Sequence, residues 1–537
     1  MKIFLRSLAI SALVALAFTG AAVRSASAQN PQVQRHPIII NEDHHDTSAP
    51  LREMIENMPI QYVETHVARD PETGRPPIIG HGPDTAVQKE VLPPVSAKLG
   101  LNFAGVGQGD YGFSDSVAPP DTNMSVGDTQ VVQWVNESFG VFDKTTGALV
   151  SGPTAGNAFW AGFGGSCQTQ NDGDIEIRYD QLAQRWVAGQ LVFESTPYMY
   201  CIAVSTTDNA LGTYNRYAIS FGNNLDDYPK VGVWPDGYYL GVNIFTNGEF
   251  YSGPEMCAMN RTAMLAGQAM TAQCFQKTTE NSLLLPSDVD GQTLPPAGEP
   301  NFDIALYNST TLHEYQFHVD FTNPNNTTFT GPISITVPSY TEPCANFNLG
   351  ECLTQPSPGE LLEALTDRLL YRLAYRNFGT YEALVVDHTV TPTGGRAQSA
   401  VRWYEIHSPD TTPTVYQSGT YQNTTRSLWM GSVAMDQFGD MALGFSNVSP
   451  TQDASIAFAG RVPSDPLGKL EAAKIIKVGT GVQENTDGRW GDYSSMSLDP
   501  TDDCTFWYTT EYIKSNGSFN WSTQIANLRF KSCAAAQ

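Results

Sequence analysis

One hairpin unit recurs along most of the chain, and this recurrence limits the folds open to it. In each copy a short apolar strand is followed by an Asp, Gly or Pro turn and then by a strand that opens near an aromatic residue. Clear copies lie at 173–187, 227–240, 429–443 and 490–508. Alternating strands joined by tight turns are typical of β-hairpins. The sequence therefore predicts an all-β chain.

The spacing of the units predicts how they assemble. Candidate units begin near Asp121, Asp172, Asp227, Asp288, Arg376, Arg426 and Arg489, about 50 to 90 residues apart. A four-stranded propeller blade takes roughly 40 to 50 residues plus loops. We therefore predict a single closed β-propeller with seven blades over residues 101–533. The alternative is a pair of β-sandwiches, which would not require a recurring unit.

Two further segments carry structural predictions. The last unit is one strand short, and Leu101 to Val106 could supply that strand and so remove an open sheet edge. Ser357 to Leu370 places several leucines at helical spacing after Pro358, which predicts a helix in an insertion between two blades.

The N-terminal region predicts export. Lys2 and Arg6 precede an apolar stretch, and Ala26-Ser27-Ala28 has the pattern of a signal-peptidase site. We expect residues 1–28 to be a cleaved signal peptide and the protein to be secreted or periplasmic. Residues 29–100 are polar and Pro-rich, so we expect an extended or disordered leader whose removal leaves the folded core intact.

The eight cysteines fall into local pairs, which favours disulfides in an exported chain. The expected pairs are Cys167 with Cys201, Cys257 with Cys274, Cys344 with Cys352, and Cys504 with Cys533. A zinc site is the alternative, but the chain contains no C-x-x-C motif.

Charge and hydropathy exclude some partners. The net charge of −25 becomes more negative once the basic residues of the signal are removed. Such a surface repels nucleic acid and anionic membranes. Beyond the signal, the sequence contains no stretch apolar enough to span a bilayer. The oligomeric state is left open by these patterns.

Three segments carry a family resemblance: Ala118 to Asn123, Tyr371 to Gly379 and Arg489 to Met496. With them the chain resembles a widespread family of secreted bacterial proteins of unassigned function, which implies export and a propeller but no activity. In addition, Ser497-x-Asp499 followed by Thr505-x-Trp507 is similar to the Asp-box turn of sialidase-like propellers, although the spacing is longer and Asp503-Cys504 replaces the glycine. That turn is structural, so this likeness implies fold only.

The loops before the innermost strands supply the candidate functional residues. Carboxylates and tyrosines there are candidates for acid, base or nucleophile: Asp174, Asp227, Tyr228, Asp492 and Tyr493. Arginines there are candidates to bind an anionic group bidentately: Arg376, Arg426 and Arg489. We expect these side chains to line one funnel. The alternative is that they cap the blades.

Two short acidic motifs are candidates for calcium, the one cofactor that the sequence suggests. They are the pairs Asp172 with Asp174 and Asp288 with Asp290. A solvated turn is the alternative for each pair.

These patterns predict a secreted propeller that binds an extracellular polymer, with carbohydrate favoured. If it is an enzyme, we expect a glycosidase or lyase acting on an anionic glycan. The main alternative is a non-enzymatic binding or scaffold protein of the envelope or secretome, and a peptidase-associated or inhibitor-like module is a third. Fold alone does not separate these functions.

Overall fold

The computed structural model describes residues 31–56, 66–67, 75–114, 117–344, 351–392 and 398–535. The predicted signal peptide, residues 1–28, lies outside these ranges. The compact unit described below spans Pro31–Gln537.

Most of this unit consists of four-stranded antiparallel sheets, which confirms the all-β prediction. Each group of strands follows the chain in order. The first three groups are β7 (Asn123–Val126), β8 (Gln130–Val135), β9 (Ser138–Asp143) and β10 (Leu149–Ala155); β11 (Glu176–Asp180), β12 (Arg185–Val192), β13 (Tyr198–Ser205) and β14 (Tyr214–Gly222); and β15 (Leu225–Val233), β16 (Tyr238–Thr246), β17 (Phe250–Met259) and β18 (Thr271–Gln276).

The next groups continue the pattern. They are β19 (Leu285–Asp290), β20 (Asn301–Asn308), β21 (Thr311–His318) and β22 (Thr328–Thr336); β25 (Leu370–Asn377), β26 (Glu382–Val390), β27 (Ala400–His407) and β28 (Thr414–Tyr421); and β29 (Ser427–Met435), β30 (Met441–Ser449), β31 (Gln452–Arg461) and β32 (Glu471–Lys477). A parallel pairing of β19 with β25 joins two of these groups into one larger sheet.

The last group confirms the expected use of an N-terminal strand. It contains β33 (Ser495–Leu498), β34 (Thr505–Ile513), β35 (Trp521–Arg529) and β5 (Lys98–Ala104), and β5 pairs antiparallel with β35. The strand that sequence analysis placed at Leu101 to Val106 thus begins three residues earlier.

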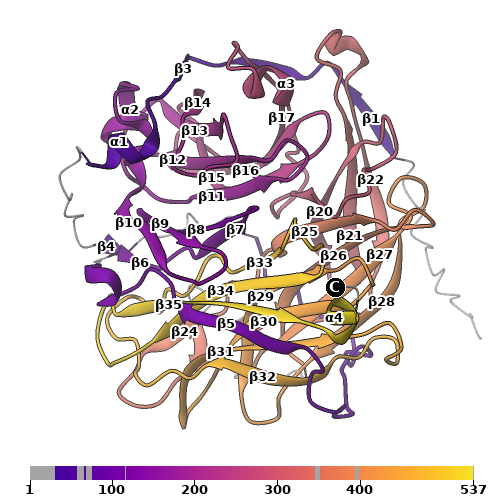
Figure 1. Ribbon diagram of the computed structural model, residues 1–537. Coiled ribbons are helices and arrows are strands. Elements are labelled where there is room, and N and C mark those ends of the chain that lie inside the picture. Colours follow the sequence, from indigo (N-terminus) through magenta and orange to yellow (C-terminus); the bar gives the residue numbers. More distant parts are fainter. Residues whose placement is uncertain are drawn as a thin grey trace, which may run out of the picture. The chain divides into compact units, whose positions relative to one another are not determined.

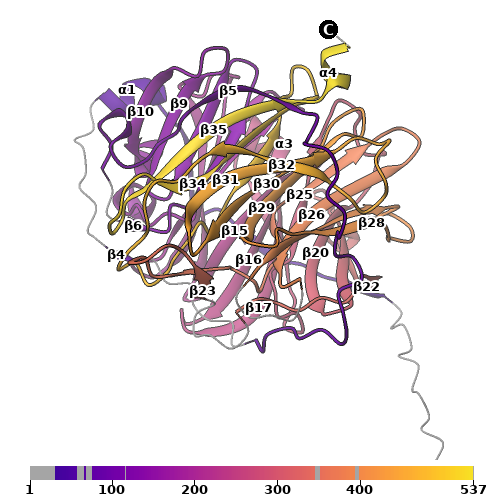
Figure 2. The same ribbon diagram turned by 90° about the horizontal axis from the view of Figure 1, so that it is seen from below.

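The first strands of the groups lie next to one another. Each contacts the first strand of the following group, and β33 also contacts β7. Figure 1 shows β7, β11, β15, β25 and β33 near the middle of the sheets, and Figure 2 shows β15, β25 and β29 from below. β15 and β29 are buried along their whole length. This explains why β29 reads as continuous apolar and small residues instead of alternating ones, whereas β15 also buries Asp226, Asp227 and Lys230.

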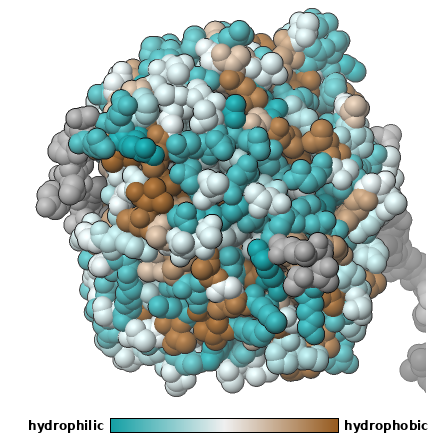
Figure 3. Space-filling view, in the orientation of Figure 1, coloured by the Kyte–Doolittle hydropathy of each residue, from teal (hydrophilic) through white to brown (hydrophobic). Residues whose placement is uncertain are grey.

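Adjacent sheets pack through aromatic side chains. All the tryptophans that the structure describes are nearly fully buried, among them Trp186, Trp403 and Trp507. A glycine makes one such contact possible: a Cβ at Gly444 on β30 would meet the ring of Tyr508 on β34 at 2.4 Å. On the face seen in Figure 3, hydrophobic surface is divided into separate patches by hydrophilic residues.

The leader is extended, but its described part belongs to the folded unit. β1 (Gln32–Arg35), β2 (Ile38–Asn41) and β3 (His44–Thr47) pair with the outer strands β22, β18 and β14. Helix α1 (Leu51–Glu56) follows, with Leu51 and Met54 buried. The expectation that the core would be unaffected by loss of this segment therefore rests on a wrong premise, since its strands are paired at the edges of three sheets.

The leader then passes the outer strands of further sheets. Val87 bridges to Thr420 on β28, Pro94 bridges to Ala472 on β32, and the chain then enters β5. β4 (His66–Val67) pairs in parallel with β6 (Val117–Ala118).

The helix expected at Ser357 to Leu370 is wrong. The segment contains β24 (Leu361–Glu363), paired with β23 (Glu351–Thr354), and ends where β25 begins. Its leucines serve two different cores, because Leu362 and Leu365 pack in one cluster and Leu369 in another. The helical spacing of these leucines is thus a coincidence, because the chain turns in this segment and the leucines pack against two different cores.

The helices of the described residues are short. Besides α1, they are α2 (Gly165–Thr169), α3 (Arg261–Leu265) and α4 (Lys531–Ala535), with single 3₁₀ turns η1 (Asp110–Gly112), η2 (Gly156–Trp160) and η3 (Pro324–Asn326). None of the helices described here has the length and apolar character needed to cross a membrane.

All four predicted disulfides are confirmed. They join Cys167 to Cys201, Cys257 to Cys274, Cys344 to Cys352, and Cys504 to Cys533. The last of these ties α4 to the start region of β34.

Candidate functional sites

The structure gathers part of the predicted funnel into a buried cluster at the amino ends of the first strands. We call Glu176, Arg178, Tyr228, Lys230 and Tyr493 the amino-end cluster. The Lys230 ammonium lies 3.6 Å from the ring centroid of Tyr228 and 3.5 Å from that of Tyr493. It donates a hydrogen bond to the carbonyl oxygen of Pro229 at 2.8 Å.

Ion pairs compensate the charges inside this cluster. The Arg178 guanidinium bonds the Glu176 carboxylate at 3.0 Å, and Lys230 lies 3.8 Å from the same carboxylate. Burial lowers the pKa of Lys230 to about 8, against the opposing field of Glu176. Burial likewise raises the pKa of Glu176, although Arg178 and Lys230 oppose the rise.

Three more of the predicted residues adjoin the cluster. Asp174 accepts a hydrogen bond from the backbone N–H of Tyr228 at 3.3 Å, and the Tyr228 hydroxyl donates to the backbone oxygen of Asp492 at 2.8 Å. Arg489 forms ion pairs with Asp492 and Glu363. Asp174 is half-buried, whereas the others are buried, so the cluster holds the strand ends together and a polymer cannot reach most of it in this conformation.

A shared backbone feature marks this end of the sheets. Asp121, Asp174, Tyr228, Met430 and Asp492 all have positive φ, between 46° and 56°. Non-glycine residues rarely adopt this left-handed conformation. This conformation recurs just before or within the first strands of five groups, those that begin with β7, β11, β15, β29 and β33.

The remaining predicted residues lie outside the amino-end cluster, so the prediction that all the candidate side chains line one funnel is wrong. Asp227 is buried within β15, paired with Asn243 in the neighbouring strand. Arg426 bonds Asn447 on β30 at 2.8 Å. Arg376 lies near the carboxyl end of β25, at the other end of the sheets, because that strand begins six residues earlier, at Leu370.

Arg376 was expected to bind an anionic group of a ligand, but its guanidinium is already paired with a carboxylate of the protein. Its two terminal nitrogens bond the Asp503 carboxylate, and its Nε donates to the backbone oxygen of Met435 at 2.9 Å. Its positive charge is therefore paired within the protein, and both terminal nitrogens already bond a carboxylate.

The geometry does not favour the predicted calcium pairs. Arg372 forms ion pairs with both Asp288 and Asp290 and so supplies the positive charge there. Asp172 accepts hydrogen bonds from the backbone N–H groups of Phe193 and Glu194, whereas Asp174 faces Tyr228. Burial raises the pKa of Asp172 to about 6, which weakens it further as a cation ligand at mildly acidic pH.

A polar hollow at the carboxyl ends of the first strands was missed by sequence analysis. We call this hollow of about 790 Å³ the mouth pocket. It is lined by the turns that follow the first strands: Asp128, Gln181, Leu182, Ala183, Gln184, Gln292, Thr293, Arg376, Asn377, Phe378, Gln437, Pro500, Thr501, Asp502 and Asp503. A smaller cavity that includes Arg178, Arg372 and Asp288 shares Gln181 and Pro500 with it.

The glutamines of the mouth pocket cross-link its turns. Gln181 donates to the backbone oxygens of Val289 and Gly291, and Gln292 donates to that of Pro500 at 3.0 Å. Gln437 donates to the backbone oxygen of Asp502 at 2.8 Å. Within the described residues the Oε1 atoms of these glutamines accept no hydrogen bond, so each amide keeps an acceptor for a ligand.

The one cation lining the mouth pocket is neutralised. Arg376 pairs with Asp503, whose pKa burial raises although Arg376 opposes the rise. Asp128 and Asp502 add further carboxylates to the lining. The pocket is therefore rich in acceptors and poor in available positive charge.

Comparison with known proteins gives only distant likeness. No family model and no curated protein matches the sequence. Among solved structures, the chain is similar to the WD40 domain of SCAP from fission yeast, with 10% identity over 75% of this chain and 82% of that one and a TM-score of 0.33. It is also similar to a subtype N10 neuraminidase-like protein of A/little yellow-shouldered bat/Guatemala/060/2010, with 11% identity over 64% and 94% and a TM-score of 0.33. An exo-beta-1,3-galactanase from Clostridium thermocellum matches with 11% identity over 78% and 88% and a TM-score of 0.28.

Proposed function

We propose that the chain is an exported, closed seven-bladed β-propeller that binds an extracellular polymer, with carbohydrate favoured, at the mouth pocket. Two observations support the ring: the first strands neighbour one another in chain order, and β33 also contacts β7. The observation that carries the binding proposal is the mouth pocket itself, where turns from six of the strand groups bring amides and carboxylates to one hollow.

The chemistry of the mouth pocket selects the ligand class. Its available groups are mainly acceptors, so a ligand must offer many donors. Sugar hydroxyls do so without carrying negative charge toward Asp128 and Asp502. A neutral glycan therefore suits this pocket better than the anionic glycan that the arginines suggested, because Arg376 already has its partner.

A row of aromatic side chains favours a polymer over a small ligand. Phe378 lines the mouth pocket, and from it Tyr381, His407 and Tyr416 follow outward over the same sheet, with successive ring centroids 4.6, 4.6 and 4.3 Å apart. Tyr381 and Tyr416 are 40% and 50% exposed. Rings with an apolar body and a hydroxyl can contact both the C–H groups and the hydroxyls of successive sugar units.

The test is binding of soluble neutral and anionic polysaccharides to the purified mature protein. We expect the double variant Gln292→Ala/Gln437→Ala to bind a neutral glycan about tenfold or more weakly, because each lost hydrogen bond contributes about 1 kcal/mol. Gln452→Ala, at the exposed first residue of β31 and outside the lining of the mouth pocket, is the matched control and should bind like the parent.

The same assay separates the alternatives. Shortened glycan products would identify an enzyme, and binding without shortening would identify a lectin-like protein. If no glycan binds, or if the double variant binds like the parent, the carbohydrate proposal fails and the non-enzymatic scaffold becomes the better reading.

A further inference from the structure

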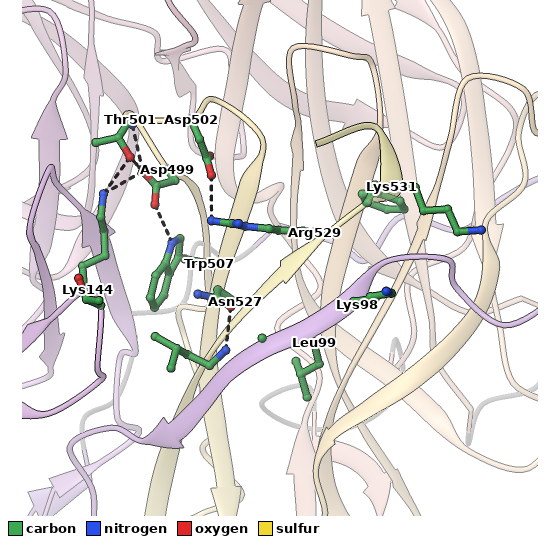
Figure 4. A pocket seen from close by; sticks show the side chains of 14 residues that line it. Lys98, Leu99, Lys144, Asp499, Thr501, Asp502, Trp507, Asn527, Arg529 and Lys531 are labelled. Atoms are coloured by element: carbon green, nitrogen blue, oxygen red, sulfur yellow. Dashed lines mark hydrogen bonds and ion pairs between the residues drawn. The ribbon is translucent and has the colours of Figure 1, made fainter. Parts of the chain in front are cut away.

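A second pocket, lined by β5, β35 and the 499–502 turn, has a different chemistry. We call this cavity of about 710 Å³ the β5 pocket; it shares only Thr501 and Asp502 with the mouth pocket. Figure 4 shows Lys144 on one side of it and Lys98 and Lys531 on the other, with Trp507 and Asn527 between them.

Basic residues are concentrated around the β5 pocket. Lys98, Lys144, Arg529 and Lys531 are four of its 14 lining residues, whereas the whole chain has 30 basic residues in 537. The only acids in the lining are Asp499 and Asp502. A pocket with an excess of positive charge therefore lies on a protein whose net charge is −25.

Only part of this positive charge is used within the protein. Lys144 pairs with Asp499 at 2.9 Å, and Arg529 pairs with Asp502 at 3.1 Å. Lys98 and Lys531 are exposed and have no charged or hydrogen-bonding side-chain partner among the described residues. Their two ammonium groups are available to a ligand.

The floor of the β5 pocket is apolar, and its polar atoms are engaged. Leu99, Leu101 and Phe530 contribute apolar surface. The Trp507 indole N–H donates to Asp499 at 3.3 Å, which fixes the ring. The Asn527 side-chain oxygen accepts from the backbone N–H of Leu101 at 2.9 Å. This floor thus offers a ligand contact area rather than hydrogen bonds.

We propose that the β5 pocket binds an organic anion, a carboxylate or sulfate carried on an apolar body. The apolar part lies on Leu99 and Leu101, above the buried Trp507 ring, and the anionic group lies between Lys98 and Lys531. Burial of apolar area supplies affinity, and the two ammonium groups select the charge. The proposal is independent of glycan binding at the mouth pocket.

The experiment is calorimetric titration of the mature protein with three probes: a naphthalene sulfonate, the matching neutral sulfonamide, and inorganic sulfate. We expect the sulfonate to bind and the other two to bind at least about tenfold more weakly, because each lacks either the charge or the apolar body. The variant Lys98→Gln/Lys531→Gln should lose about tenfold or more in sulfonate affinity, and Lys98→Arg/Lys531→Arg should retain it.

Two controls make the result specific. Lys89→Gln/Lys469→Gln removes the same charge elsewhere and should leave the affinity unchanged. Thermal unfolding of each variant verifies that it is folded. The proposal is overturned if sulfonate and sulfonamide bind equally, if inorganic sulfate binds as well as the sulfonate, or if removing Lys98 and Lys531 changes affinity no more than the control.

Discussion

The ammonium group of Lys230 lies between the rings of Tyr228 and Tyr493, less than 4 Å from each ring centroid. A fully buried cation is costly unless it is compensated, and here two aromatic faces, the Glu176 carboxylate and the Pro229 carbonyl share that role. Because Tyr228 and Tyr493 come from sheets far apart in the sequence, this single contact ties together the amino ends of their strands.

The first prediction concerns Lys230. Replacing Lys230 with Met leaves Glu176 buried with one partner fewer and removes both cation–π contacts. We expect the free energy of unfolding to fall by about 3 kcal/mol or more. The control is Lys469→Met, which breaks an exposed pair with Glu90 and should cost about 0 to 1 kcal/mol. Urea denaturation of both variants checks this, and equal losses would contradict it.

The second prediction concerns the leader. Asp84 pairs with Arg402, which is fully buried, at 2.6 Å. Asp84→Ala leaves that guanidinium without its counter-charge, so we expect a loss of about 3 to 5 kcal/mol. Glu90→Ala, a nearby leader residue with an exposed pair, is the matched control. A deletion of residues 31–94 should destabilise the protein still more; a truncated protein that unfolds like the parent would show that the leader is dispensable.

The third prediction concerns pH. Burial raises the pKa of Asp436 to about 8 and that of Glu255 to about 7, above the usual carboxyl range. Between about pH 4 and pH 8 the folded state therefore holds protons that the unfolded state has released. The stabilisation that these carboxyls contribute is fully present below about pH 4 and is lost as pH rises toward 8. Each such group contributes a slope of about 1.4 kcal/mol per pH unit. Stability should fall from pH 5 to pH 8.

Asp436→Asn isolates one of these groups. The amide keeps the oxygen that accepts from the backbone N–H groups of Phe438 and Asp440, but it cannot ionise. Urea denaturation at pH 5, 6, 7 and 8 should show a shallower fall for this variant. A slope identical to that of the parent would mean that Asp436 is ionised in the folded protein.

The fourth prediction ranks the disulfides. Cys504 and Cys533 are 29 residues apart, whereas Cys344 and Cys352 are 8 apart. A cross-link restricts the unfolded chain more when its loop is longer, which gives about 3.6 kcal/mol for the first and about 2.6 kcal/mol for the second. Replacing each pair with serine should therefore lower the melting temperature more for Cys504 and Cys533. The reverse order would point to enthalpic effects.

Sequence patterns predicted the regular part of the fold. Aromatic strands after tight turns identified the hairpins, and the missing strand of the last unit identified β5 as the partner of β35. The leader strands were missed for a physical reason: outer strands such as β1, with mostly exposed side chains, need only backbone hydrogen bonds and carry no apolar alternation.

The candidate site was predicted only in part. Asp174, Tyr228, Asp492 and Tyr493 meet: Asp174, Asp492 and Tyr493 come just before a first strand, and Tyr228 lies within β15 at its register shift. Arg376 was placed at the wrong end, because the unit was expected to begin near Arg376 whereas β25 begins at Leu370. The mouth pocket left no local signal, because Gln292 and Gln437 look like ordinary turn residues until the turns converge.

The position of the leader has a consequence for the order in which the chain matures. β1, β2 and β3 are synthesised before β22, β18 and β14, yet they pair with those later strands. β5 likewise pairs with β35, which lies some 420 residues later in the chain. The part of the chain that is synthesised first is thus among the last to acquire its strand partners, because those partners must be synthesised before the leader strands can pair with them.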